Sequence, residues 1–260
     1  AMSRDVDAVV KALFDAGVEL VTVKDFHRTA YNLLPEMIDR RAVVVCGYRQ
    51  GPVPGLGDPK DADGVMMLGM HAAAGTSGFL AHTLTSRLAS LKVNGRPLAE
   101  VELFAAALAP FGLPALFFSG CPRACAQARQ RIPGIQTFSI DKSIPPHALD
   151  ADRWRKGLAR SAVEALSNET TKPYRPQGPF RADIAIRDGA KAAAKMADRW
   201  GFDRTGARVH IDAPDMDTLY NRLIRLCYLP PLAEKTLPFS LMLFNAMGWL
   251  GRLWVRRQLN

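Results

Sequence analysis

The sequence predicts an α/β fold: a mixed, largely parallel sheet flanked by helices, with a smaller C-terminal α/β lobe. Short apolar, β-branched runs alternate along the chain with segments whose apolar residues recur at helical spacing, and this alternation is typical of strand–helix–strand units. A polar, proline-rich stretch, "NETTKPYRPQGP" (168–179), interrupts the alternation once. We therefore expect a main lobe over residues 1–167, a linker over 168–179 and a C-terminal lobe over 180–260.

The main lobe begins with a predicted helix whose apolar residues, from Val6 to Phe14, lie on one face. Ser3 is a candidate N-cap of this helix and Gly17 ends it. Three predicted strands follow. The third, "GVMMLGM", is a continuous apolar run, which is typical of a strand buried on both faces. The predicted ranges of these strands are 18–23, 42–47 and 64–70.

An Asn-Gly pair at 94–95 predicts a β-hairpin, and a helix from about Ala99 to Pro110 is expected after it. Strands and helices then continue to alternate through both lobes. The remaining strands are predicted at 115–120, 137–140, 182–186 and 207–213, and the remaining helices at 122–132, 152–166, 188–200 and 215–228.

The C-terminal stretch, "FSLMLFNAMGWLGRLWVRRQL" (239–259), is apolar with a basic end. Its uninterrupted apolar part is shorter than the roughly 18 residues that a spanning helix needs, so we do not expect a membrane partner. Docking on a neighbouring subunit is the preferred interpretation, with the protein's own core and a membrane surface as alternatives. One helical face would carry five large apolar residues at three- and four-residue steps: Phe239, Leu243, Met247, Leu250 and Trp254.

Composition narrows the class of protein. The chain has 260 residues, of which 48% are hydrophobic, and this is enough for a sizeable core. The formal net charge of +9 would suit a nucleic-acid partner, but the basic residues form only small clusters and no nucleic-acid-binding motif is present. We therefore expect no nucleic-acid partner. The four cysteines form neither a CxxC motif nor a paired zinc knuckle, which favours reduced thiols and a cytoplasmic location.

Three polar residues lie at the ends of predicted strands. Asp25 and His27 follow the strand at 18–23, and His71 follows the strand at 64–70. Ligands bind at the carboxyl ends of strands in open α/β sheets, and Glu100, at the start of a helix, adds an oxygen donor. Two histidines and a carboxylate suit zinc, manganese or iron. A single histidine at a strand end is more often structural, so spacing alone leaves both interpretations open.

Three segments resemble the D-aminopeptidases of peptidase family M55. The family carries a DxH motif at one strand end, a histidine followed by alanine at another, a histidine followed by Ser or Thr in the next segment, and an NGRPxGE motif before a helix. The order and the intervals match in this chain. The segments are "VTVKDFHRTAYNLLPE" (21–36), "GVMMLGMHAAAGTSGFLAHTL" (64–84) and "VNGRPLAEVELFAAALAPFGLPALFFSG" (93–120).

The resemblance implies roles for particular residues. His27, His71 and Glu100 match zinc ligands of a two-metal site, His82 matches the catalytic histidine, and Asp25 is interpreted as a group that supports the ligands. The implied activity is a zinc-dependent aminopeptidase for short peptides with an N-terminal D-amino acid, such as D-Ala peptides. The family also forms ring-shaped homo-oligomers.

Three departures from the family pattern lead to a second hypothesis. The family's first strand carries a DxEG motif that supplies further zinc ligands, and this motif is not found in the sequence, so the two-zinc site is expected to be incomplete. "SGCPRA" (119–124) stands where the family tends to have GDD, and Pro146 stands near a family arginine. The alternative is therefore a catalytically silent, oligomeric protein that binds peptides or serves as a scaffold.

Overall fold

The computed structural model describes residues 2–59, 61–145 and 147–259, so the predicted departure at Pro146 lies outside the described residues. The mixed α/β fold class is confirmed, since parallel sheets are flanked by helices. The chain forms two compact units from interleaved stretches of sequence. Unit 1 comprises Ala1–Lys60, Ala151–Val163 and Leu232–Asn260, and unit 2 comprises Asp61–Asp150 and Glu164–Pro231.

Unit 1 contains the predicted first helix and the first two strands. Helix α1 (Met2–Asp15) buries its apolar stripe as predicted. Ser3 is not its N-cap, because the helix already begins at Met2 and the Ser3 hydroxyl accepts a hydrogen bond from the Leu34 backbone N–H at 3.0 Å. Strands β1 (Thr22–Lys24) and β2 (Val43–Val45) pair in parallel and are shorter than predicted.

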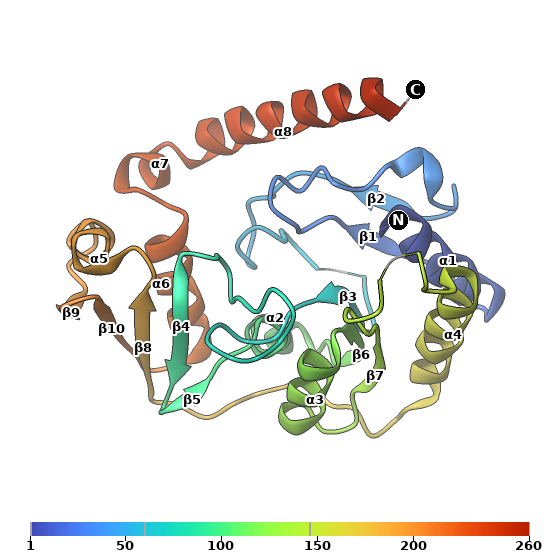
Figure 1. Cartoon of the computed structure of the whole chain (residues 1–260), viewed down its shortest axis with the longest axis horizontal. Coiled ribbons are helices and arrows are strands. Elements are labelled where there is room, and N and C mark those ends of the chain that lie inside the picture. Colours follow the sequence, from blue (N-terminus) through green and yellow to red (C-terminus); the bar gives the residue numbers. More distant parts are fainter. Residues whose placement is uncertain (1, 60, 146, 260) are drawn as a thin grey trace. The chain divides into compact units, whose positions relative to one another are not determined.

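The other regular elements of unit 1 are helical. The Arg155 guanidinium contacts the Asp5 carboxylate at 2.7 Å and so joins the fourth helix to α1. The last helix, drawn in red in Figure 1, runs from Leu237 to Leu259 as one uninterrupted element. The elements are η1 (Pro35–Met37), α4 (Ala151–Glu164), α7 (Pro231–Lys235) and α8 (Leu237–Leu259).

Unit 2 contains a three-stranded parallel sheet in the order β3-β6-β7. The central strand, β6 (Ala115–Gly120), is buried along nearly all its length. Strand β3 (Val65–Met70) lies at the edge of this sheet and buries only Met67, so the prediction that this run is buried on both faces is wrong. Strand β6 has a hydrogen-bonded neighbour on each side, whereas β3 has one on a single side, so more of the surface of β3 stays accessible. The other edge strand is β7 (Gln136–Ser139).

The largest sheet of unit 2 is antiparallel, in the order β5-β4-β8-β10-β9. Asn94 and Gly95 have positive φ angles of 49° and 80°, as the predicted hairpin turn requires. Strands β4 and β8 pair directly, so strands from both sides of the proline-rich connector share this sheet. The strands are β4 (Leu88–Val93), β5 (Arg96–Pro97), β8 (Phe180–Ile186), β9 (Asp203–Thr205) and β10 (Arg208–Ala213).

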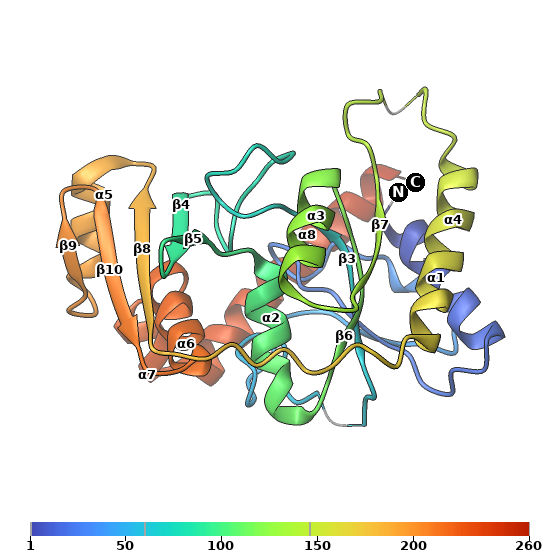
Figure 2. The same cartoon turned by 90° about the horizontal axis from the view of Figure 1, so that it is seen from below.

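Helix α2 (Glu100–Leu108) is the central helix of unit 2. Every residue from Val101 to Leu108 is buried, and the helix contacts α3, α6 and β3 (Figure 2). Glu100 is therefore held at the start of a helix that is packed on several sides. The other helical elements of unit 2 are η2 (Ala109–Phe111), α3 (Pro122–Arg131), η3 (Ala165–Ser167), α5 (Gly189–Ala197) and α6 (Met216–Cys227).

Two further features of the described residues bear on function. None of their helices has the length and apolarity to cross a membrane. The four cysteines are free thiols, and burial raises the pKa of the Cys125 and Cys227 thiols, the latter to about 12. Buried thiols that stay protonated are poor nucleophiles, so these two cysteines are not candidates for catalysis.

Candidate functional site

Two histidines meet in the loop between β3 and β4. His71 directly follows β3, and the loop returns so that the rings of His71 and His82 lie 4.6 Å apart between centroids, at an interplanar angle of 43°. The backbone N–H of His82 donates to the carbonyl of Ala72 at 3.1 Å. The loop therefore folds back on the strand end and brings together two of the predicted site residues.

Backbone carbonyls orient both rings. The Nδ1 atom of His71 lies 3.2 Å from the carbonyl oxygen of Phe79, and the Nδ1 atom of His82 lies 2.8 Å from that of Leu80. Because a carbonyl only accepts hydrogen bonds, Nδ1 is the donor in each ring. The lone pair of each neutral ring is then on Nε2. This tautomer suits a histidine that binds a metal or accepts a proton.

Glu100 lies next to His82. Its carboxylate accepts a hydrogen bond from the backbone N–H of Leu84, two residues beyond His82, at 2.9 Å. Glu100 as a whole is half-buried, but its carboxylate is removed from water, and this burial raises its pKa; the charge on His82 opposes the shift. His82 therefore interacts electrostatically with Glu100 and packs against the ring of His71.

A buried threonine joins the three segments that carry these residues. The Thr83 hydroxyl accepts a hydrogen bond from the Ala74 backbone N–H at 3.0 Å and donates one to the Leu98 carbonyl at 2.8 Å. Its side chain is fully buried. The sequence did not single out Thr83, and the available signal was only a hydroxyl residue beside His82 in a stretch of small and apolar residues.

A glutamine on α3 holds the same loop from another side. The Gln127 Oε1 atom accepts a hydrogen bond from the Ala73 backbone N–H at 2.9 Å, and its amide nitrogen lies 3.4 Å from the Thr76 hydroxyl. Gln127 is far from the loop in sequence, and no local pattern points to it. Both ends of the histidine loop are thus fixed by side chains whose importance depends on tertiary contacts.

The other two predicted site residues belong to unit 1. Asp25 follows β1 and is 3% exposed, and its carboxylate accepts hydrogen bonds from the backbone N–H groups of His27 (3.2 Å), Leu33 (2.8 Å) and Asn32. Asp25 therefore organises the loop that carries His27, whose side chain is exposed. Whether His27 converges on the residues of unit 2 remains a prediction.

The residues present can be tested against zinc. Two imidazoles and a carboxylate in unit 2 are the right kinds of donor. Across residues 2–59, 61–145 and 147–259, however, no group of three or more His, Cys, Asp and Glu side chains is arranged to hold a metal ion. The described residues therefore do not fit a complete metal centre.

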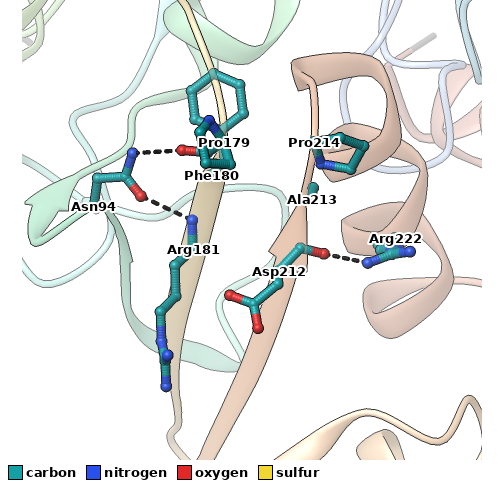
Figure 3. Close-up of a pocket in the computed structure, with 8 residues that line it drawn as sticks. All are labelled: Asn94, Pro179, Phe180, Arg181, Asp212, Ala213, Pro214 and Arg222. Carbon is teal, nitrogen blue, oxygen red and sulfur yellow. Dashed lines mark hydrogen bonds between the residues drawn. The ribbon is translucent and has the colours of Figure 1, made fainter.

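A cavity of about 520 Å³ opens elsewhere in unit 2 (Figure 3). The Asn94 side chain bonds to the Pro179 carbonyl (3.0 Å) and to the Arg181 backbone N–H (2.8 Å), and Arg222 donates to the Asp212 carbonyl. Two polar side chains that line the cavity, those of Asn94 and Arg222, are thus already bonded to backbone groups. No predicted site residue lines the cavity. The lining residues are Asn94, Pro179, Phe180, Arg181, Asp212, Ala213, Pro214 and Arg222.

Comparison with known proteins points to one family. The model of peptidase family M55, described as D-aminopeptidase, matches residues 1–224. A D-aminopeptidase of Bacillus subtilis (strain 168) is 27% identical over 232 residues, which cover 86% of this chain and 83% of that protein. The fold is similar to the solved structure of the Bacillus subtilis D-aminopeptidase DppA, described as zinc-dependent and as a self-compartmentalizing protease. The TM-score is 0.77 at 24% identity, over 88% of this chain and 85% of that one.

Proposed function

The chain belongs to peptidase family M55, the D-aminopeptidases, and from this premise we propose that it hydrolyses short peptides with an N-terminal D-amino acid, such as D-Ala peptides. The observation that carries the proposal is the pairing of the His82 and His71 rings in unit 2, with Glu100 in electrostatic interaction with His82. These are three of the four residues that the family motifs assign to metal binding and catalysis.

His82 is the proposed catalytic residue. Its Nδ1–H is held by the Leu80 carbonyl, so the neutral ring accepts a proton at Nε2 without losing its orientation. The nearby Glu100 carboxylate stabilises the imidazolium that forms, because opposite charges favour each other in a partly desolvated site. His82 therefore has the two properties of a general base: a defined tautomer and a charged neighbour.

Zinc binding is the finer part of the proposal. We propose His27, His71 and Glu100 as zinc ligands, with Asp25 supporting the His27 loop through the hydrogen bonds described above. Support comes from the family motifs and from the description of the solved relative as zinc-dependent. Because the described residues do not form a complete metal group, we assign no step of the reaction to a metal.

Assembly and location follow the same reasoning. The solved relative is described as self-compartmentalizing, which supports a homo-oligomer, and a ring is the form that we propose. The four free thiols support a cytoplasmic location.

The second candidate function is a catalytically silent protein that binds peptides or serves as an oligomeric scaffold. The finding that favours it is the lack of a three-residue metal group among the residues that the structure describes. A silent protein would retain the fold of the family and its peptide affinity but would not turn over.

Hydrolysis assays separate the two functions. The purified full chain, supplied with zinc, is expected to cleave D-Ala-D-Ala faster than L-Ala-L-Ala. Replacing His82 by Ala should lower kcat/KM by about 100-fold or more, the usual contribution of a general base. His147→Ala is the matched control, since His147 is exposed and outside the site. Binding of D-Ala-D-Ala without turnover under any divalent metal would instead establish the silent function.

A further inference from the structure

Helix α8 is attached to unit 1 by one face. The Asn245 side chain bonds to both the N–H and the carbonyl of Tyr48, each at 2.9 Å. Gly248 packs so tightly that an added Cβ would lie 2.6 Å from the Tyr31 ring. The Arg252 guanidinium lies 5.2 Å from the centroid of the same ring. These three residues recur at three- and four-residue steps, so they define the inner face of the helix.

The opposite face of α8 is apolar and exposed. The predicted stripe is 53–65% exposed at every position, and four flanking apolar residues are 42–61% exposed. The apolar stripe of a surface helix normally packs against the core or a partner, and here it faces away from unit 1. The stripe is Phe239, Leu243, Met247, Leu250 and Trp254, and the flanking residues are Met242, Phe244, Trp249 and Val255.

The exposed area is the size of a protein interface. At about 100 Å² for each large, half-exposed side chain, the five stripe residues present roughly 500 Å² of apolar surface, and the four flanking residues add roughly 400 Å² on the two sides of the helix. The largest apolar patch of a typical monomer is about 300–600 Å², and each partner of a stable complex buries about 800 Å². The family match ends at residue 224, so this surface lies outside the region that the family model describes.

The charges on α8 favour a protein partner over a lipid surface. Helices that lie on anionic membranes direct Lys and Arg toward the lipid headgroups. Here Arg256 pairs with Glu36 at 3.0 Å, and Arg252 contacts the Cys46 sulfur at 3.3 Å, so two of the three arginines are engaged with unit 1. No charged residue lies in α8 before Arg252.

The order of residues in the stripe indicates which protein would cover it. Read from either end, the stripe runs aromatic, leucine, methionine, leucine, aromatic. In an antiparallel pair of identical helices, Phe239 therefore faces Trp254, Leu243 faces Leu250, and Met247 lies beside the twofold axis. Three- and four-residue spacing also suits packing at a shallow crossing angle. We propose that α8 packs antiparallel against α8 of a second copy of this chain, in a self-complementary twofold contact.

A charge exchange at the axis tests this proposal in the full chain. In M247E two carboxylates would face each other, and in M247K two ammonium groups would, so each variant should have half the wild-type mass by light scattering. An equal mixture of the two variants pairs opposite charges and should recover the wild-type mass. The control is L232E, the same change of charge at a residue of α7 that is 73% exposed and outside the stripe, and its mass should equal that of wild type.

Three outcomes overturn the proposal. These are a wild-type mass of one chain over a hundredfold range of concentration, an M247E mass equal to wild type, and a mixture that stays at half mass. Circular dichroism verifies folding, and M247Q with the same readout replaces M247E should that variant unfold. If wild type is a single chain that sediments with phosphatidylcholine–phosphatidylserine vesicles and M247E does not, the face binds lipid and the proposal is wrong. The result does not depend on peptidase activity.

Discussion

The two units hold their candidate site residues in different ways. In unit 1, one carboxylate, that of Asp25, organises the His27 loop through bonds to residues at most eight positions away. In unit 2, the His71–His82 loop is held by Thr83 and Gln127, whose bonds reach residues 9 to 54 positions away. A loop held by one group should lose its conformation when that group is removed. A loop held by several groups should lose alignment gradually. The first two of the four substitutions below test this difference, and the other two compare a buried charge in unit 1 with a helix cap in unit 2.

The largest effect is expected for Asp25→Ala. This change leaves the backbone N–H groups of His27, Asn32 and Leu33 without the buried carboxylate that accepts their hydrogen bonds. Hydrogen bonds to charged groups contribute strongly, and unsatisfied buried donors are costly, so we expect a loss of about 2–4 kcal/mol in the free energy of unfolding. Urea unfolding measures it, with the exposed Glu19→Ala as control. A loss equal to that of the control would show that the loop is held by other contacts.

Thr83→Val should have the next largest effect. Valine has the same shape but removes both hydrogen bonds of the buried hydroxyl, which costs about 1–3 kcal/mol. The His71 and His82 segments would also lose alignment, so kcat should fall more than KM changes if the proposed activity holds. Thr83→Ser retains the hydroxyl and should restore kcat. Equal kcat values for the Val and Ser variants would exclude a positioning role.

The third prediction concerns pH and Lys24 of unit 1. Burial, followed by repulsion from Arg49, lowers the pKa of Lys24 to about 8 from the ordinary lysine value of 10.5. Between these values the folded state binds fewer protons than the unfolded state, so this group makes stability rise with pH from about 8 to 10.5. The unfolding free energy of wild type minus that of Lys24→Met should therefore rise by about 1–2 kcal/mol across this window, after allowance for partial solvent screening. A constant difference would mean that the amine titrates normally.

The smallest effect is expected at a helix end in unit 2. The Asp215 carboxylate caps α6 by accepting from the Thr218 backbone N–H at 2.7 Å, and this bond lowers the pKa of Asp215. Asp215→Ala should cost about 1 kcal/mol at neutral pH. Because the folded pKa is depressed, that cost should vanish as pH falls through it. Thermal melts at neutral and acidic pH measure this effect, and kcat at neutral pH should not change.

Elements whose signals are local could be predicted from the sequence. The Asn-Gly hairpin, the start of α2 at Glu100 and the exposed stripe of α8 were predicted because turn chemistry and helical periodicity involve residues only a few positions apart. The family motifs likewise pointed to the histidines and Glu100 by order and spacing, and their roles stay predictions. Strand β9 was missed because its residues, "DRT", are all polar and exposed and carry no alternating pattern.

The pairing of strands and of distant side chains could be read only from the folded structure. Strand β4 pairs with β8 across the proline-rich connector, and β3 takes the edge of its sheet, although its apolar sequence is typical of a central strand. Thr83 and Gln127 hold the histidine loop only because distant backbone groups come within hydrogen-bond reach. Local propensity and periodicity depend on neighbours along the chain, whereas strand partners and buried hydrogen bonds depend on how the whole unit packs.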